Sequence, residues 1–313
     1  MRTGQVARVP ALLLALGLVA TATSSKTHDF NYNFRLDRDH DGPITSCSDF
    51  EMRFGQDGDD IVTVRRDKTL VVKEPGSGPL RVRPGEHGGV FVQPSTDGGY
   101  SALVCMAAGA RSSQDADAIL DQVQIENTDG TLSVSCPESD WAAYIVLSVP
   151  PDVVLDLGTT NGPLNLWDVS GNFTLRTTNG PISIAGTNGV VDAQTQNGPI
   201  KFTGHEGDVR LEAQNGPVKV TLDDATWTGR GLDASTQNGP AKLEAPDSLN
   251  AGVEIHGSWH SPVKVNGAKS WRGVGPGGPR YYRLGSGPVL VRLSTVNGPL
   301  EIKGPEPAGP VEI

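Results

Sequence analysis

From residue 161 to residue 202 the chain reads NGPLNLWDVSGNFTLRTTNGPISIAGTNGVVDAQTQNGPIKF. The tripeptide Asn-Gly-Pro opens this stretch and returns after 18 residues. A fixed period of this length indicates a repeat architecture, in which each unit buries its apolar face against its neighbours. The tripeptide begins at six positions in the chain, and the first four are 18 residues apart: Asn161, Asn179, Asn197, Asn215, Asn238 and Asn297.

Each Asn-Gly-Pro copy is followed by an alternating segment, as in Ile182-Ser183-Ile184. This alternation predicts a half-buried β-strand. Proline suits the first residue of a strand, and Asn-Gly suits a turn because both residues tolerate positive φ. The predicted inward-facing residues of this strand are Leu164, Leu166, Ile182, Ile184, Ile200, Phe202, Val218, Val220, Ala241, Leu243, Leu300 and Ile302.

A second turn follows within the period, and its glycine lies ten residues after the asparagine, as in Ser170-Gly171 and Asn188-Gly189. It opens another alternating run. Two strands per period predict an all-β fold, a single-chain parallel β-solenoid (a flattened β-helix or β-roll) with about 18 residues per coil and strands about 4.8 Å apart. The predicted inward residues of the second strand are Phe173, Leu175, Thr177, Val191, Ala193, Thr195, Val209, Leu211 and Ala213.

Composition and charge agree with a turn-rich β-protein. The chain has 39 glycines and 23 prolines, and only 5% of its residues are aromatic, which predicts an aliphatic core. Its formal net charge of −10 argues against a nucleic-acid partner, because phosphate neutralisation needs a basic face.

The chain divides into four segments. Residues 1–22 have the pattern of a signal peptide, with Arg2 and Arg8 before an apolar run and a small-residue cleavage site at 20–22. We therefore expect export to the periplasm, cell surface or medium, without a transmembrane anchor. Residues 23–45 are expected to form a flexible polar segment, residues 46–150 irregular N-terminal β coils, and residues 151–313 the regular array.

Two of these segments contain a further ambiguity. Residues 37–42 match the front half of a calcium loop, but Ser48 stands where a bidentate glutamate is needed, so we interpret them as a solvated tether and predict no metal site. Residues 112–123 carry apolar side chains at helical spacing and predict either one short helix or a loop.

Cys47, Cys105 and Cys136 would enter an oxidising compartment after export. One disulfide can form by any of three pairings. We favour Cys47 with Cys105, because Cys105 ends an apolar strand and Cys47 begins the part of the chain expected to be ordered.

One outward residue lies between the paired aliphatics of each first strand, and in four coils it is lysine: Lys201, Lys219, Lys242 and Lys264. Stacking would place these like charges in one column, which is unfavourable unless something offsets them. Glu212 and Glu244 could do so, which is the structural interpretation. An anionic polysaccharide bound to the column is the functional one.

Two other groups of residues also allow structural explanations. The stacked asparagine amides can hydrogen-bond from coil to coil, so we interpret the asparagine column as structural. Aromatic residues in the later, irregular part could stack on sugars or cap the open end of the array: Trp227, Trp259, Trp271, Tyr281 and Tyr282.

Motifs of the common enzyme classes are absent, including a nucleophile elbow, a phosphate loop and paired-cysteine zinc spacing. Sugar-cleaving β-helix enzymes need two cooperating carboxylates, and the row stacked on Asp192 offers Thr174 and Arg210 instead. We therefore expect neither an enzyme nor a cofactor. A carbohydrate-active enzyme remains the less favoured alternative.

The succession of a valine-rich strand ending in Val149-Pro150, then residues 153–157, then Asn-Gly-Pro strands alternating with Ser-Gly or Glu-Gly strands resembles the bacterial putative adhesin family, DUF4097. The resemblance covers roughly residues 45–303. It implies a β-solenoid exported to the cell envelope and supplies no catalytic residues. The regular pattern changes after residue 220, with an insertion at 223–231 and His260-Ser261-Pro262 in place of Asn-Gly-Pro, so the register of the last coils stays open.

These observations lead to a functional hypothesis. We expect a non-catalytic, adhesin-like binding module whose partner is a cell-surface or extracellular polysaccharide, or another envelope protein. The alternative is a structural envelope protein that assembles through the ends of its array.

Overall fold

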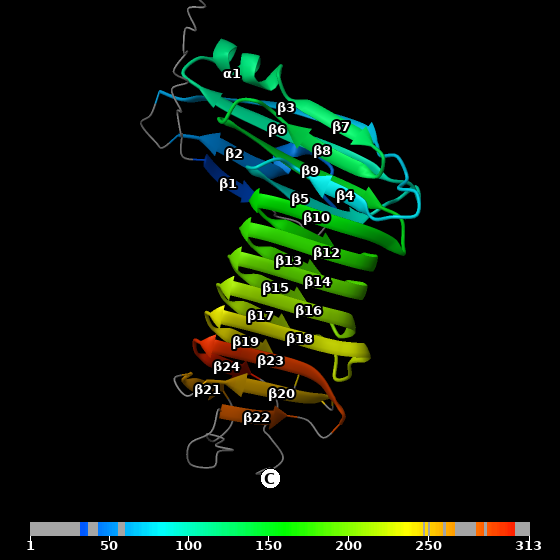
Figure 1. The fold of residues 1–313 in the computed structure, drawn as a ribbon, viewed down its shortest axis with the longest axis vertical. Coiled ribbons are helices and arrows are strands. Elements are labelled where there is room, and N and C mark those ends of the chain that lie inside the picture. Colours follow the sequence, from blue (N-terminus) through cyan, green and yellow to red (C-terminus); the bar gives the residue numbers. More distant parts are fainter. Residues whose placement is uncertain are drawn as a thin grey trace, which may run out of the picture.

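The computed structural model describes residues 32–36, 43–55, 60–246, 248–249, 251–258, 261–266, 280–284 and 287–303. This part of the chain is all-β apart from one short α-helix and one 3-10 turn, and most of its strands form two stacked sheets (Figure 1). The signal-peptide segment, the calcium-like residues 37–42, and Trp259 and Trp271 lie outside the described residues.

The described strands form two sheets of eleven strands each and one two-stranded sheet. Sheet I has the spatial order β22 (Arg280–Leu284), β20 (Gly252–Gly257), β23 (Val289–Asn297), β18 (Thr228–Asn238), β16 (Glu206–Asn215), β14 (Asn188–Asn197), β12 (Ser170–Asn179), β10 (Val153–Asn161), β4 (Leu80–Arg83), β8 (Thr131–Ser135) and β7 (Gln124–Thr128). Sheet II has the order β21 (Val263–Asn266), β24 (Leu300–Lys303), β19 (Ala241–Glu244), β17 (Val218–Thr221), β15 (Ile200–Thr203), β13 (Ile182–Ala185), β11 (Leu164–Trp167), β5 (Gly88–Pro94), β9 (Trp141–Val149), β6 (Ser101–Ala110) and β3 (Val62–Val71).

Strands 18 residues apart are parallel neighbours in both sheets. Ile182 pairs with Ile200 in sheet II, and Phe173 pairs with Val191 in sheet I. The chain alternates between the sheets, so each period from β10 to β17 adds one strand to each. The predicted parallel pairing at this spacing is therefore confirmed.

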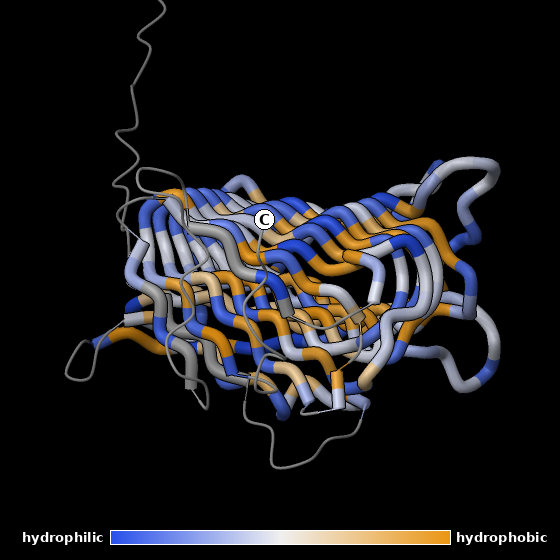
Figure 2. The backbone as a smooth tube through the Cα atoms, turned by 90° about the horizontal axis from the view of Figure 1, so that it is seen from below, coloured by the Kyte–Doolittle hydropathy of each residue, from blue (hydrophilic) through white to orange (hydrophobic). Residues whose placement is uncertain are grey.

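The core lies between the two sheets. Viewed from the end of the stack, the strands of each sheet follow one another along two broad, closely opposed faces (Figure 2). Every residue predicted to face inward on either strand is buried, from Leu164 to Ile302, and Thr177 is the most exposed of them at 6%. Alternation in sequence thus identified the core face of both strands correctly.

The Asn-Gly-Pro turn differs from the expectation of positive φ. None of its six asparagines has positive φ, and of its glycines only Gly216 does, at 159°, near the extended limit. The glycine is needed for close approach instead: a Cβ built on Gly180 would lie 2.0 Å from the carbonyl oxygen of Gly162, and one on Gly198 would lie 2.1 Å from that of Gly180. Positive φ occurs at the second turn, where Gly189 has φ 120°.

The N-terminal region departs from the expected irregular coils. Only β4, β5, β8 and β9 continue the parallel stacks, whereas β6 runs antiparallel to β9 and to β3, and β7 runs antiparallel to β8. β9 also differs from the strands of the regular coils, because its residues from Trp141 to Leu147 are all buried. A strand that is apolar on both faces needs cover on its outer side as well as its core side.

An outer layer supplies that cover. It comprises β2 (Phe50–Phe54), which pairs antiparallel with β1 (Tyr32–Leu36), and the segment that precedes β2. Phe50 packs between Phe91 of β5 and Tyr144 of β9, with ring centroids 5.2 and 5.7 Å away. These side chains form an apolar cluster separate from the core between the two sheets.

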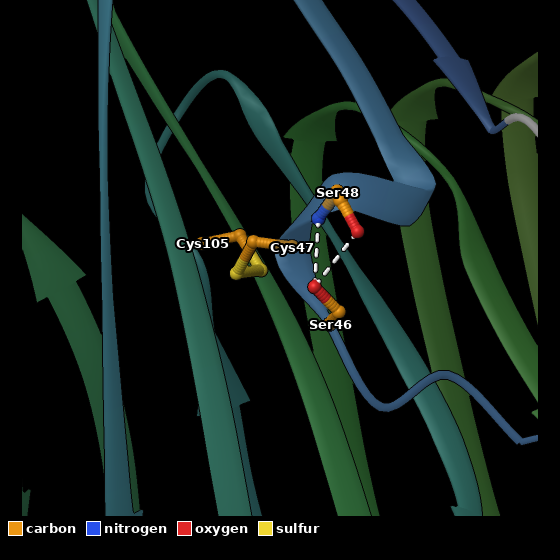
Figure 3. The surroundings of a disulfide bond; sticks show 4 residues. All are labelled: Ser46, Cys47, Ser48 and Cys105. Carbon is orange, nitrogen blue, oxygen red and sulfur yellow. Dashed lines mark hydrogen bonds between the residues drawn. A yellow bond between two sulfur atoms is a disulfide. The ribbon is translucent and has the colours of Figure 1, made fainter.

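A disulfide joins the outer layer to sheet II (Figure 3). It links Cys47, in a 3-10 turn at Cys47–Asp49, to Cys105 of β6, and Cys136 is a free thiol. The backbone N–H of Ser48 donates to the Ser46 hydroxyl at 3.1 Å and closes the turn. The cross-link limits how far this layer can separate from β6 in the unfolded chain.

The segment at 112–123 contains the helix α1 (Ser113–Leu120). Ser112 is its N-cap, since the Ser112 hydroxyl accepts from the backbone N–H of Asp115 at 3.1 Å. Arg66 of β3 pairs with Asp117 and Asp121 of the helix at 2.7 and 2.6 Å. No helix among the described residues combines the length and the apolar character needed to span a bilayer.

The insertion in the repeat folds as an extension of the turn before β18. Trp227 is 7% exposed, its ring lies 6.0 Å from that of Phe202, and its indole N–H donates to the carbonyl of Gly207 at 3.3 Å. Trp227 is therefore buried within the array, and neither interpretation holds for it, since its ring is not exposed to sugars and does not cap an open end. Tyr281 and Tyr282 belong to β22, and their side chains lie outside the described part of the structure.

The final coils do not stack in chain order. β23 lies between β18 and β20 in sheet I, and β24 lies between β19 and β21 in sheet II. The Asn297 copy of the turn thus stacks directly on the Asn238 copy, although residues 252–266 come earlier in the chain. At this contact glycine is required, because a Cβ at Gly298 would lie 1.9 Å from the Gly239 carbonyl oxygen. The segment that stacks on the other side of β24 carries Ser261 at the corresponding position.

Candidate functional site

The lysines singled out from the sequence lie on the outer face of sheet II. Lys201 pairs with Lys219, and Lys219 with Lys242. Lys264 is not the next member, because Glu301 of the inserted β24 pairs with both Lys242 and Lys264. The expected column of four adjacent lysines is therefore wrong: three are adjacent, and a glutamate separates them from the fourth.

Glu244 forms ion pairs with two of these lysines, and Glu301 lies 3.8 Å from the second of them, Lys242. The Glu244 carboxylate lies 2.7 Å from the ammonium of Lys219 and 3.3 Å from that of Lys242. The hydrogen bond from Lys219, assisted by Lys242, lowers the pKa of Glu244 below its usual value in spite of partial burial. The structural interpretation thus holds for Lys219 and Lys242. Glu212 does not contribute, since it lies in sheet I and pairs with Arg210.

Lys201 differs from its neighbours. Its side chain is exposed, and within the part of the chain that the structure describes it makes no ion pair. Of the three adjacent lysines it alone keeps its charge uncompensated by a described carboxylate.

The asparagine column forms a continuous ladder of side-chain hydrogen bonds. Each amide N–H donates to the amide oxygen of the preceding copy, at 2.8 Å from Asn179 to Asn161 and 2.9 Å from Asn297 to Asn238. The links from Asn197, Asn215 and Asn238 measure 2.9, 3.0 and 2.9 Å. Because these groups satisfy one another, a structural role accounts for the column.

A second ladder lies inside the turn. Thr195 donates its hydroxyl proton to the carbonyl of Gly180 at 3.2 Å, and Thr236 donates to that of Gly216 at 2.8 Å. Thr177 and Thr295 make the same bond to Gly162 and Gly239. These buried bonds tie the carboxyl-terminal ends of neighbouring sheet I strands together.

The outer surface of sheet I carries a groove that sequence reasoning missed. It has a volume of about 790 Å³ and crosses the carboxyl-terminal ends of β10, β12, β14, β16 and β18. Two rows of outward-facing positions line it. The row at the rim consists of Thr160, Thr178, Gln196, Gln214 and Gln237, and the next row consists of Gly158, Arg176, Gln194, Glu212 and Ser235.

The row of residues at the rim of the groove could have been recognised in the sequence. The residue before each of the first five asparagines is threonine or glutamine. The rim glutamines Gln196, Gln214 and Gln237 are exposed, and their side chains make no hydrogen bond to any residue in the described ranges. Their amides are thus available to a ligand as both donors and acceptors.

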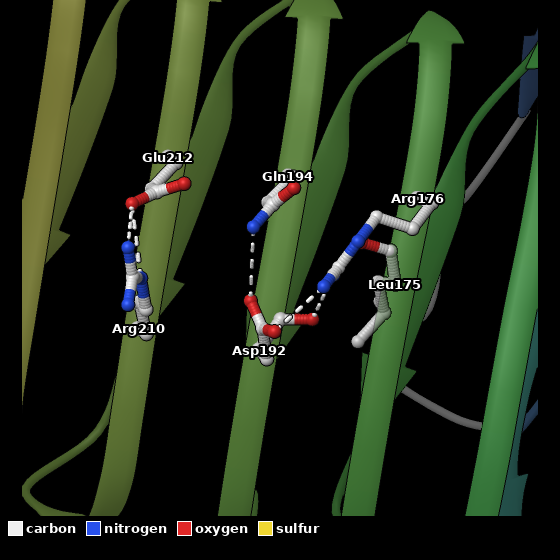
Figure 4. A network of polar contacts seen from close by, with 6 residues as sticks. All are labelled: Leu175, Arg176, Asp192, Gln194, Arg210 and Glu212. Carbon is white, nitrogen blue, oxygen red and sulfur yellow. Dashed lines mark hydrogen bonds and ion pairs between the residues drawn. The ribbon is translucent and has the colours of Figure 1, made fainter.

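The charged groups of the groove are paired within the protein (Figure 4). Arg176 contacts the Asp192 carboxylate at 2.6 Å and also donates to the backbone carbonyls of Asp192 and Leu175. Gln194 donates to the other oxygen of Asp192 at 3.5 Å, and Arg210 pairs with Glu212. Polar but neutral hydrogen-bonding groups therefore dominate the exposed groove.

No three histidine, cysteine, aspartate or glutamate side chains gather as a possible metal site within the described ranges.

Comparison with known proteins gives matches among solved structures alone. No family model matches the chain, and no curated protein matches it. A putative adhesin from Bacteroides fragilis is 16% identical, with 78% of this chain and 97% of that chain covered and a TM-score of 0.37. A putative adhesin from Parabacteroides distasonis is 11% identical, with coverages of 76% and 97% and a TM-score of 0.38. A putative lipid binding protein from the same species is 10% identical, with coverages of 76% and 96% and a TM-score of 0.27.

Proposed function

We propose that the protein is an exported, non-catalytic, adhesin-like module of the cell envelope that binds an extended polysaccharide in the groove of sheet I. We further propose that the regular region is a flattened β-solenoid, since the chain passes from one sheet to the other at every turn and residues 18 apart pair in parallel. The export assignment rests on the leader pattern of residues 1–22.

The observation that carries the proposal is the repetition of exposed polar side chains along the groove. Gln196, Gln214 and Gln237 lie on successive strands of sheet I, whose spacing is about 4.8 Å. A row of identical amides at a constant interval suits a ligand that also repeats. A chain of sugar units offers hydroxyl groups that accept and donate hydrogen bonds at regular intervals.

The paired charges favour a ligand with little charge of its own. Arg176 and Arg83 each hold a carboxylate, with Arg83 2.9 Å from Asp156, so an anionic ligand would have to displace a protein partner. Such an exchange returns little net free energy, because it replaces one exposed ion pair by another. The polysaccharide expected in this groove is therefore neutral, in contrast to the anionic polymer suggested by the lysines alone.

Assembly through the ends of the array is the second candidate, and the edge strand β3 argues against it. This strand carries Arg65, Arg66, Asp67 and Lys68 in succession. Charged residues on an edge strand oppose pairing with another sheet edge.

The proposal is tested by isothermal titration of the mature protein with neutral linear polysaccharides, such as a mannan and a β-glucan, at low and high salt. We expect binding that changes little with salt, because the contacts are hydrogen bonds between neutral groups. Replacing Gln196, Gln214 and Gln237 together by alanine should weaken it by about tenfold or more. The control Gln124→Ala removes an exposed glutamine from the same sheet outside the groove and should leave affinity unchanged.

Absence of binding to every neutral polysaccharide tried, or equal affinity in the triple variant and the wild type, would contradict the proposal.

A further inference from the structure

A second, smaller pocket lies on the opposite face of the molecule, where the outer layer ends on sheet II. Its volume is about 240 Å³. Ile44 and Phe91 form one wall, and the outer surfaces of β11, β13 and β15 form the floor. The outer layer covers one part of sheet II and leaves the next part exposed, which forms a step on the outer face of the sheet. The pocket lies at the inner corner of this step.

The wall of this step is held firmly in place. The backbone N–H of Ile44 donates to the side-chain oxygen of Gln93 at 2.8 Å, and the Gln93 amide donates back to the Ile44 carbonyl at 3.0 Å. Gln93 is 8% exposed, and Ile44 is 4% exposed. The pocket therefore does not depend on a mobile side chain for its shape.

The floor carries three different polar groups in one row. Asn165 pairs with Ser183, and Ser183 pairs with Lys201, so an amide, a hydroxyl and an ammonium group follow one another at about 4.8 Å intervals. Outward-facing Trp167 lies at the end of β11 and lines the same pocket. Apolar walls with a few convergent polar groups are typical of small-molecule sites.

The positive charge of this floor comes from one lysine, Lys201. Lys219 and Lys242 are compensated by Glu244, whereas Lys201 has no carboxylate partner among the described side chains. A single ammonium group at the end of a row of neutral hydrogen-bonding groups suits a ligand with one negative charge and several hydroxyls.

We propose that this pocket binds one carboxylated sugar unit, with its carboxylate on Lys201, its hydroxyls on Asn165 and Ser183, and its ring against Trp167. This site is distinct from the groove of sheet I and does not depend on it. The ammonium–carboxylate contact is a charge-assisted hydrogen bond, the strongest of the interactions available there. It limits the ligand class to acidic sugars, free or at the end of a glycan.

The test uses galacturonic acid, which carries one carboxylate, and its methyl ester as probes in isothermal titration with the mature protein. We expect the acid to bind, more weakly as salt rises, and the ester to bind at least about tenfold more weakly. Lys201→Gln should cause a similar loss for the acid, and Lys201→Arg should retain binding. Lys68→Gln removes an exposed lysine from the same sheet far from the pocket and serves as the matched control.

Several outcomes would overturn the inference: no binding of the acid, equal binding of the acid and the ester, or wild-type affinity in Lys201→Gln. The groove variant lacking Gln196, Gln214 and Gln237 separates the two sites. It should bind the acid as the wild type does, and loss of acid binding in that variant would move the site to sheet I.

Discussion

At the scale of single residues, the glycine of the Asn-Gly-Pro turn determines whether two coils can stack. The carbonyl oxygen of each such glycine points at the place where the next glycine would carry a Cβ, with separations of 1.9 to 2.2 Å across the copies. Contacts that short do not occur between real atoms, so any larger residue must displace the backbone of its neighbour. Backbone contact, and not turn conformation, makes glycine necessary here.

Gly180→Ala should destabilise the protein strongly. The new Cβ would meet the backbone of Gly162 at 2.0 Å, and a backbone contact cannot be relieved by a side-chain rotation. We expect the free energy of unfolding to fall by about 3 kcal/mol or more. Chemical denaturation followed by circular dichroism measures this.

The matched control is Gly78→Ala. Gly78 also precedes a proline, but a methyl group added there would have no heavy atom within 4 Å. The effect of this substitution should stay within about 0.5 kcal/mol. Equal destabilisation by both substitutions would show that loss of glycine flexibility, and not contact with the adjacent coil, governs the turn.

At the scale of elements, the insertion before β18 shows how an irregular turn is attached to a regular sheet. Trp227 anchors it on the apolar side through its buried ring. On the exposed side, His205 contacts the Asp223 carboxylate at 2.7 Å, and Asp224 accepts a hydrogen bond from the backbone N–H of Thr226 at 3.0 Å. The insertion is therefore held by one buried ring and one titratable pair.

The titratable pair predicts that the insertion is held more firmly at lower pH. The hydrogen bond to Asp223 raises the pKa of His205, and the charges of Asp223, Asp224 and Glu206 act in the same direction. Since the pKa is higher in the folded state, the stabilisation is complete below the unfolded value of 6.5 and is lost as pH rises through the folded pKa.

Amide hydrogen exchange of residues 223–231 between about pH 5 and pH 8 tests this, after correction for the intrinsic rate. Protection should decrease as pH rises in the wild type, and this dependence should be absent in His205→Gln. A pH dependence that persists in the variant would assign it to another group.

At the scale of the whole molecule, the order of the coils in space differs from their order in the chain. β23 and β24 are the last described strands of the sequence, yet each lies in the interior of its sheet. In a sequential array, removal of the C-terminal strands would expose one new edge and leave the rest unaffected. Here it removes an interior layer.

A chain shortened to residues 1–286 should therefore lose structure beyond the deleted residues. β20 pairs in parallel with β23, and β21 with β24, so both lose their partner strands. Hydrogen exchange should show loss of protection at 252–257, while β12 and β14 remain protected. Full protection of 252–257 in the shortened chain would show that this coil can stack without the inserted layer.

Much of the fold could be predicted from local pattern. The alternation around Ile182-Ser183-Ile184 identified the core face, and the 18-residue period identified which strands pair. The antiparallel strands β6 and β3 could not be predicted in the same way, because they belong to no repeat and no constant spacing indicates their partners. The groove was not predicted, although the row of residues at its rim can be seen in the sequence. Whether such a row borders a groove depends on how neighbouring strands are placed in the folded protein.

The sequence by itself determined the parallel repeat, the buried face of each strand and the asparagine ladder, because each depends on residue identity at a constant spacing. The tertiary structure alone decided that Glu301 separates Lys242 from Lys264, that Glu244 compensates two lysines, and that Lys201 lies beside the step of the outer layer. The first of these facts follows from insertion of a distant segment between two coils. The other two depend on side-chain placement between adjacent strands and on the position of the outer layer. Local periodicity cannot predict such an insertion. It indicates which segments are able to stack on one another, but not which of several similar segments stacks on a given coil.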